Sequence, residues 1–172
     1  FPTRRSSDLK SNTWLGIRDI VVNPIDEPIV DNDMGTLSID KLSLQGGTLA
    51  KVTDGDNSTF AHFAEDPYKG GTIKDYIPID ASLILTFKNP KKLGTINFVQ
   101  DSKTDKITKY ALEYTIDGKN WQEIAKYDGQ AAVNEDVSAL NLTVKAVRIR
   151  NLELNLQNDS AGFWWKVYDF SV

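Results

Sequence analysis

One short segment, residues 51–60 with the sequence KVTDGDNSTF, gathers the side chains most suited to chemistry. Carboxylates at Asp54 and Asp56 lie on either side of a glycine, and Thr59 adds a hydroxyl. Three interpretations fit this composition: a tight turn capped by its own side chains, a site for a hard cation that takes oxygen ligands, and an acid pair for hydrolysis. The segment is not an EF-hand, because the twelve-residue ligand spacing with its terminal Glu is absent.

Composition limits the classes of protein to which the chain can belong. The 172 residues are 40% hydrophobic and carry a net charge of −4, which suits one globular domain with some additional chain. Lys and Arg are not clustered, so nucleic acid is not expected as a partner. No apolar run reaches the roughly eighteen residues of a membrane span. Because the chain has no cysteine, disulfides, thiolate catalysis and cysteine-based zinc sites are excluded.

The first nine residues, FPTRRSSDL, are interpreted as an artefact of the reading frame. Their back-translation matches a common sequencing adapter, so residues 1–9 are excluded from fold reasoning. The chain is therefore expected to be a fragment of a longer reading frame. The lack of a recognisable signal peptide then carries no information about where the protein is located.

The elements that must position these side chains are expected to be β-strands. Apolar residues alternate with a period of two, and the segments are rich in Ile, Val, Leu, Thr and aromatic residues. The sequence predicts strands at 36–44, 82–89, 94–100, 108–116, 121–127 and 142–151. Asp-Gly at 117–118 marks a hairpin, because glycine supplies the positive φ that the turn needs. No segment has a capped helical pattern, so the predicted fold class is all-β, an antiparallel β-sandwich.

The two ends of the chain are similar to each other. WLGIRDIVV (14–22) aligns with WWKVYDFSV (164–172) at an offset of 150 residues, with Trp, Asp and the final Val in register. Tandem modules repeat at such an interval. Residues 10–33 are therefore interpreted as the last strand of a preceding module plus a stiff linker, and residues 34–172 as one module. The alternative, that 14–22 is the first strand of this same domain, remains open.

Four motifs in order give the chain a resemblance to the factor V/VIII type C, or discoidin, domains. They are the Asp-Gly-Asp-x-x-Thr-aromatic loop, LEYTIDGKNWQEI (112–124), VKAVRIRN (144–151) and the final WWKVYDFSV. More narrowly, residues 36–172 resemble family 32 carbohydrate-binding modules of bacterial hexosaminidases and hyaluronidases. The resemblance implies a discoidin-like jelly-roll sandwich, a secreted or cell-surface bacterial location, and other modules on the same chain as partners.

The resemblance also implies a structural Ca²⁺ that ties the early loop to the last strand. Carried over position by position, its ligands are Lys51 (through its backbone carbonyl), Asp54, Asp56, Thr59, Tyr168 and Asp169. Asp169 departs from the family, in which the longer Glu is commoner, and the shorter carboxylate can lengthen or lose one coordination bond. An acid held by a metal does not shuttle protons freely, so the acid-pair interpretation is set aside.

A sugar-binding surface is the third implication of the resemblance, made of an aromatic platform and a few polar groups on loops at one end of the sandwich. The expected ligand-binding residues are His62, Phe63, Gln100, Asp101, Phe163 and Trp164. Phe163 is the first choice for the platform, and Trp164 is the second. Phe60 and Trp121 resemble family residues of the core and are given no function.

Alternation along the last strand divides its side chains between two faces. It places Trp165 and Val167 on one face, and Trp164, Lys166 and Tyr168 on the other. One of the two tryptophans is therefore expected in the core and the other at the surface.

The predicted function is a non-catalytic, calcium-stabilised carbohydrate-binding module that targets a secreted bacterial glycoside hydrolase to the terminal sugar of a glycan. Galactose-binding relatives place an Arg and an Asn where this chain has Gln100 and Ile107, so a galactose preference is not carried over. That departure supports a second hypothesis, a structural spacer or protein-docking module without sugar binding. A hydrolase active site would need paired carboxylates in a cleft and more chain, so catalysis is not expected.

Overall fold

The structure of the protein is a computed structural model that describes residues 34–65, 76–155 and 163–172. These residues belong to one unit, Asp33–Val172. The predictions made for residues 1–33, namely the artefact, the preceding strand and the linker, lie outside the described residues. Within the described ranges, no helix is long and apolar enough to cross a membrane.

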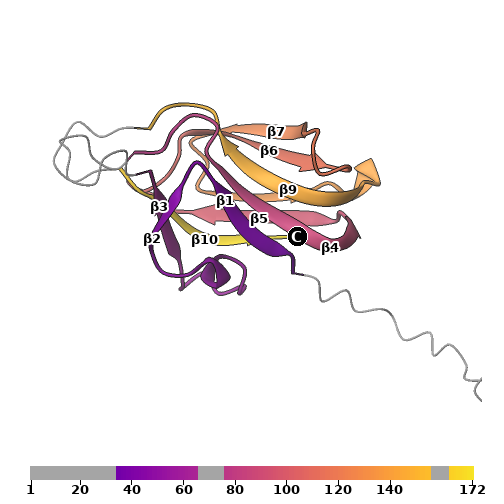
Figure 1. Cartoon of the computed structure of the whole chain (residues 1–172), viewed down its shortest axis with the longest axis horizontal. Coiled ribbons are helices and arrows are strands. Elements are labelled where there is room, and N and C mark those ends of the chain that lie inside the picture. The colour runs from indigo at the N-terminus through magenta and orange to yellow at the C-terminus, as the bar shows by residue number, and fades with distance from the viewer. Residues whose placement is uncertain (1–33, 66–75, 156–162) are drawn as a thin grey trace, which may run out of the picture. The chain divides into compact units, whose positions relative to one another are not determined.

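Two antiparallel five-stranded sheets pack face to face in this unit, as Figure 1 shows. The first sheet has the strand order β1-β4-β9-β6-β7, and the second has the order β2-β3-β10-β5-β8. The elements are β1 (Thr36–Asp40), β2 (Ser43–Gly46), the 3-10 helix η3 (Leu49–Val52), β3 (Ala61–Ala64), β4 (Ser82–Lys92), β5 (Thr95–Gln100), β6 (Lys109–Thr115), β7 (Gln122–Asp128), β8 (Ala132–Asp136), the 3-10 helix η4 (Ser138–Leu140), β9 (Thr143–Asn151) and β10 (Trp165–Ser171). The predicted antiparallel sandwich is confirmed.

One predicted strand is wrong, because residues 36–44 form two strands that belong to different sheets. Lys41 has φ 56°, in the left-handed region, and turns the chain from β1 in the first sheet to β2 in the second. Leu42 is buried between them, so the apolar alternation continues across the turn and hides it. β3 and β8 were not predicted, because one has four residues and the other is a largely polar strand at the sheet edge.

Aromatic side chains fill the space between the sheets. The Phe98 ring lies at the centre, with its centroid 5.4 Å from that of Tyr110, 6.2 Å from Trp165 and 6.2 Å from Phe170. All three contacts are edge-to-face, the geometry that aromatic rings prefer. These side chains are fully buried, which confirms that one tryptophan of the Trp-Trp pair lies in the core.

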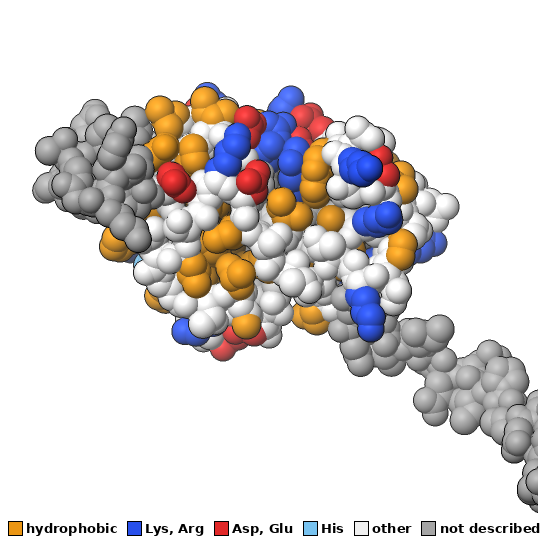
Figure 2. Space-filling view, in the orientation of Figure 1, with side chains coloured by type: hydrophobic (Ala, Val, Ile, Leu, Met, Phe, Trp, Pro, Cys, Tyr) orange, Lys and Arg blue, Asp and Glu red, His pale blue; other side chains and the backbone are white. Residues whose placement is uncertain are grey.

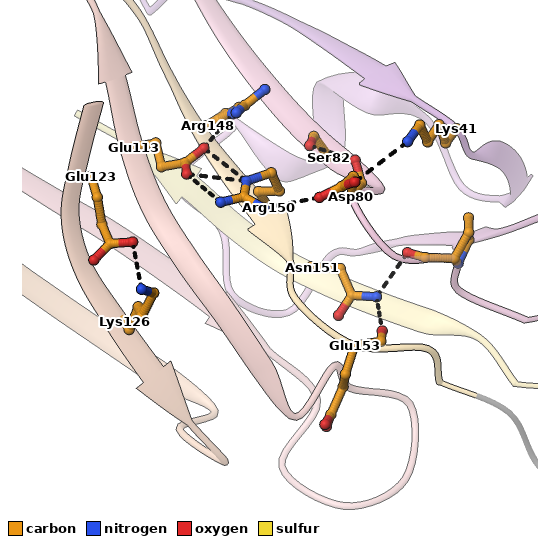
Figure 3. A network of polar contacts seen from close by, with 11 residues as sticks. Lys41, Asp80, Ser82, Glu113, Glu123, Lys126, Arg148, Arg150, Asn151 and Glu153 are labelled. Carbon is orange, nitrogen blue, oxygen red and sulfur yellow. Dashed lines mark hydrogen bonds and ion pairs between the residues drawn. The ribbon is translucent and has the colours of Figure 1, made fainter. Parts of the chain in front are cut away.

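Charged side chains form a network on the outward side of the first sheet (Figure 3). Glu113 on β6 is 5% exposed and accepts hydrogen bonds from Arg148 Nε at 2.6 Å and Arg150 Nη2 at 2.7 Å, both on β9. Arg150 also donates to Asp80 at 2.9 Å, and Lys41 lies 3.7 Å from the same carboxylate. Acidic and basic side chains lie beside one another in the space-filling view as well (Figure 2). This face is therefore held together by ion pairs between neighbouring strands.

Candidate functional site

The Asp-Gly-Asp loop follows η3 and is folded by its own side chains. Asp54 Oδ1 accepts a hydrogen bond from the backbone N–H of Asp56 at 2.8 Å, and Asp56 Oδ1 accepts one from Ser58 at 2.9 Å. Gly55 lies between the two acids with φ 74°, a conformation that favours glycine. The capped-turn interpretation therefore describes the backbone of this loop. A cation site depends on where its remaining oxygens lie.

Oxygen atoms outnumber hydrogen-bond donors at the centre of the loop. The Thr59 hydroxyl oxygen lies 2.8 Å from Asp54 Oδ2. It also lies 3.1 Å from the carbonyl oxygen of Lys51 and 3.2 Å from that of Asp56. A hydroxyl has one proton and donates to one acceptor at a time. The Asp56 carbonyl also accepts the backbone N–H of Thr59 at 3.0 Å, so the hydroxyl proton leaves either the Lys51 carbonyl or Asp54 Oδ2 without a donor, an arrangement that a hard cation stabilises.

A β-bulge in the last strand brings Asp169 into the same region. β10 pairs with β5 through Val167 and Asp169, and Tyr168 is the extra residue between them. Asp169 is 7% exposed; its Oδ2 accepts a hydrogen bond from Ser171 at 3.0 Å, and its Oδ1 is buried with no hydrogen-bond partner among the described residues. Burial raises the pKa of Asp169, and the nearby negative charge of Asp54 raises this pKa further.

These features fit a Ca²⁺ site shared by the loop and the last strand. A buried carboxylate oxygen without a donor is costly, and a cation would satisfy both it and the charge of Asp54. In the part of the chain that the structure describes, no three His, Cys, Asp or Glu side chains converge as a metal cluster. The expected ligand set needs no such cluster, because carbonyl and hydroxyl oxygens supply part of it. The structure groups Lys51, Asp54, Asp56 and Thr59 directly, and it places Asp169 near Asp54 and Tyr168 next to Asp169.

A second group of residues, which we call the aromatic face, lies on the outward side of β3 and β10. Its members are Phe60, His62, Trp164, Lys166 and Tyr168. His62 and Lys166 are cross-strand partners. The His62 ring lies 5.0 Å from the Phe60 ring and 5.4 Å from the Trp164 ring. Lys166 Nζ lies 4.0 Å from the Phe60 centroid and 5.2 Å from the Tyr168 centroid, within the range of a cation–π interaction.

His62 is the polar centre of the aromatic face. Its Nε2 is buried, has no hydrogen-bond partner among the described residues, and lies 3.9 Å from Asp105 Oδ2. Burial lowers the pKa of His62 below its ordinary value of 6.5, and Asp105 opposes this shift without reversing it. The imidazole is therefore mostly neutral at pH 7. A neutral imidazole has one N–H donor and one acceptor nitrogen, and because Nε2 is buried, contact with a ligand hydroxyl is expected through the other ring nitrogen.

Asp101 begins a turn that fixes the rim of the aromatic face. Its Oδ2 accepts hydrogen bonds from the backbone N–H groups of Lys103, Thr104 and Asp105 at 2.9–3.3 Å. Burial favours the neutral acid, but these three donors outweigh it and lower the pKa of Asp101. Lys166 connects the turn to β10, because its carbonyl accepts from Asp101 N–H and its own N–H donates to the Asp105 carbonyl. The turn is thereby held at the edge of the aromatic face.

Two of the predicted ligand-binding residues, Phe63 and Gln100, face inward. Phe63 is fully buried, and Gln100 is 2% exposed. The amide of Gln100 donates to the carbonyls of Ile107 and Gln130 and accepts from the Ile107 N–H and the Trp165 indole N–H. Every polar atom of this side chain is thus paired inside the protein. The prediction that Phe63 and Gln100 contact a ligand is at odds with this burial, and both serve the core.

Two residues expected in the core lie outside it. Phe60 is half-buried on the aromatic face, and Trp121 is half-buried with the Arg148 guanidinium 4.2 Å from its ring centroid. Of the two platform candidates, Phe163 is half-buried and packs against the core, whereas Trp164 is 37% exposed. Trp164 is therefore the better placed platform for a ligand.

Sequence reasoning missed three contributors to this surface. Alternation places Lys166 on the face of Trp164, although no role was predicted for it. Phe60 could have been found, since it lies two residues from His62 and a period of two puts both on the same face. Asp105 gave no signal, because it lies in a turn and its approach to His62 results from the pairing of Lys166 with that turn.

Comparison with known proteins identifies the fold independently. The model of the F5/8 type C domain family matches residues 38–169, almost the whole of the described sandwich. No curated protein sequence matches the chain.

Several solved structures share this fold. Chitosan-binding module 2 of a chitosanase/glucanase from Paenibacillus sp. IK-5, solved with chitotriose, has a TM-score of 0.58 and 13% identity, covering 80% of this chain and 94% of its own. A family 32 carbohydrate-binding module of NanJ from C. perfringens, solved with galactose, has a TM-score of 0.55 and 14% identity, covering 80% and 91%. The CpGH89CBM32-5 module from Clostridium perfringens, in complex with GalNAc-β-1,3-galactose, has a TM-score of 0.52 and 14% identity, covering 78% and 93%.

Proposed function

The chain belongs to the F5/8 type C domain family, and from this membership we propose that residues 34–172 form a non-catalytic carbohydrate-binding module. The observation that carries the proposal is the exposed Trp164 ring beside the neutral His62 on the aromatic face. An indole ring packs against the C–H face of a sugar, and the imidazole with the Asp105 carboxylate can bind sugar hydroxyls. Sugars bound to three modules of the same fold support this assignment.

The proposed biological role is to hold a secreted bacterial glycoside hydrolase on its glycan. One module of the same fold derives from a chitosanase/glucanase, and the organisms named above are bacteria. A shallow surface with one exposed aromatic ring leaves little free energy after the cost of association. We therefore expect dissociation constants in the high micromolar to millimolar range, about −4 to −6 kcal/mol. Several modules on one chain would raise such an affinity to a useful level.

A structural Ca²⁺ is part of the proposal. Lys51, Asp54, Asp56, Thr59 and Asp169 would hold it together with Tyr168. The ion, when bound, would supply the positive charge that the buried Asp169 and its neighbour Asp54 need. It would tie the loop after η3 to β10, whose outward side carries the aromatic face. Its role would be to stabilise that face and not to bind the sugar.

The test is binding of the full chain to a glycan array, followed by calorimetric titration of any sugar that is retained. We expect binding of the wild-type chain and a marked loss for Trp164→Ala, with unchanged melting temperature. Phe163→Ala provides the comparison, because this neighbouring ring packs against the core. An array without any bound glycan would contradict the proposal and favour the alternative of a structural spacer or protein-docking module.

A further inference from the structure

A hollow of about 300 Å³ lies next to the aromatic face, on the outward side of the second sheet. Its lining residues include Asn57, Val99, Asp101, Ser102, Ala132 and Tyr168. They come from the Asp-Gly-Asp loop, from β5, β8 and β10, and from the turn after β5. Pockets that hold small molecules measure about 300–1,000 Å³, so this hollow has room for a small ring rather than a large ligand.

Tyr168, at the bulge in β10, gives the hollow its aromatic wall. Tyr168 is the extra residue of the bulge, between Val167 and Asp169, which pair with β5. Bulges redirect a side chain and occur next to functional sites. Here the Tyr168 side chain lies on the outward side, where it lines the hollow, while Asp169 turns inward.

The composition of the hollow suits a sugar ring. Val99, Ala132 and the Tyr168 ring offer apolar surface to the C–H groups of a pyranose. Asn57, Asp101 and Ser102 offer an amide, a carboxylate and a hydroxyl to its hydroxyl groups. Asp101 is held in place for this role, since its Oδ2 is fixed by three backbone N–H groups.

The hollow is continuous with the aromatic face. Tyr168 belongs to both, and its ring lies 5.8 Å from the Phe60 ring of that face. Asp101 lines the hollow and interacts electrostatically with His62. We propose that the hollow is a second saccharide subsite, so that the module binds an oligosaccharide of at least two sugar rings in preference to a single terminal sugar. This inference rests on the proposed function of the aromatic face and adds the chain length of its ligand.

Two pairs of probes test the inference by calorimetric titration of the full chain. One pair is N-acetylgalactosamine and GalNAc-β-1,3-galactose, and the other is chitotriose and its monosaccharide unit. For at least one pair, the longer sugar is expected to bind about tenfold more tightly, which corresponds to about 1.4 kcal/mol. The backbone amide resonances of Ser102 and Ala132 should shift in the NMR spectrum with the longer sugar only.

Ala132 offers a matched pair of variants, because it is exposed and lines the hollow. Ala132→Trp should fill the hollow and remove the tenfold gain, while the affinity for the monosaccharide and the melting temperature stay unchanged. Ala132→Ser leaves the hollow open and should retain the gain. Melting curves of both variants check that the fold is intact.

The possible outcomes separate the second subsite from the proposed function. Binding of monosaccharides with no gain for the longer sugars would overturn the second subsite and leave the proposed function standing. A gain that persists in Ala132→Trp, with no shift at Ser102 and Ala132, would also overturn it. Loss of monosaccharide binding in Ala132→Trp would show that the hollow is the primary site, which contradicts the inference. No binding of any probe by the wild-type chain would overturn the second subsite, and an array that retains no glycan would overturn the proposed function as well.

Discussion

Two neighbouring tryptophans show that a shift of one position in a strand decides whether a side chain is exposed or buried. Trp164 is 37% exposed beside His62, whereas Trp165 is fully buried against Phe98 and donates its indole N–H to Gln100. The same side chain therefore serves a surface at one position and the core at the next. The difference follows from strand alternation, and each position predicts a different result on substitution.

Trp165→Ala should lower the free energy of unfolding by about 3–5 kcal/mol, because it leaves a large cavity in the core. Trp164→Ala should leave this free energy nearly unchanged and weaken sugar binding by about tenfold, because a stacked ring is lost. Chemical denaturation and calorimetric titration measure the two effects. A large stability loss in Trp164→Ala would show that this ring serves the fold instead of a ligand.

His62 makes a smaller contribution to the same surface. His62→Ala should weaken sugar binding by about 1 kcal/mol, the value of one hydrogen bond. Because burial lowers the pKa of His62 below 6.5, the imidazole is neutral at pH 7 and binding should change little between pH 7 and pH 8. The affinities of the wild-type chain at both pH values, measured beside those of the variant, test this. Equal sugar affinity of the variant and the wild-type chain would show that His62 does not contact the sugar.

At the scale of elements, a cross-strand ion cluster joins β6 to β9. Glu113 lies directly opposite Arg148 in the ladder, and Arg150 reaches it from the diagonal position. Burial alone would raise the pKa of Glu113, but hydrogen bonds from the two arginines outweigh it and hold the pKa below its ordinary value of 4.5. The carboxylate is therefore charged in the folded state, and its charge stabilises the fold.

Glu113→Gln should lower the free energy of unfolding at pH 7 by about 1.5–3 kcal/mol, the range for hydrogen bonds to charged groups. Because the folded pKa is lowered, this stabilisation is present above pH 4.5 and is lost as the pH falls through the folded pKa. The difference between wild type and variant should therefore shrink in acid. Glu123→Gln is the control, since its ion pair with Lys126 is exposed and should contribute less than about 1 kcal/mol. A constant difference down to low pH would contradict the assignment.

The loop after η3 and the bulge in β10 form the second element-scale feature. A ligand that binds the folded state alone stabilises it by about 2.7 kcal/mol at a hundredfold excess over its Kd. Adding a chelator should therefore lower the melting temperature by several degrees, and Asp54→Ala should abolish this response. Asp117→Ala provides a matched control, because Asp117 also precedes a glycine with positive φ, in the hairpin between β6 and β7. If neither chelator nor added Ca²⁺ changes the melting temperature of the wild-type chain, the proposed Ca²⁺ site is contradicted.

For the whole molecule, the sequence predicted the layers better than the connections between them. Alternation identified most of the strands, because each buries one face, and it separated Trp164 from Trp165 correctly. It could not show the crossing between sheets at Lys41, since the buried Leu42 continues the alternation of apolar residues across the turn. Nor could it show that Gln100 is buried, because two partners of its amide, Gln130 and Trp165, lie 30 and 65 residues away in the sequence. Alternation along a strand indicates which side chains are buried. The candidate site depends instead on contacts between strands, which form only when the sheets assemble.

Removal of residues 1–32 tests the boundary of the module. The unit begins at Asp33, and the backbone at Gly35 lies so close to β4 that a Cβ there would meet the side chains of Leu85 and Phe87. If residues 10–33 belong to a preceding module and linker, the fragment 33–172 should unfold cooperatively at the melting temperature of the full chain.

A second fragment, 42–172, gives the contrast for this experiment. It lacks β1, which pairs with β4 over five positions and buries Leu37. Its melting temperature should therefore fall well below that of the fragment 33–172. If the fragment 33–172 itself loses its cooperative transition, residues 14–22 supply a strand of this sandwich and the tandem-module interpretation is wrong.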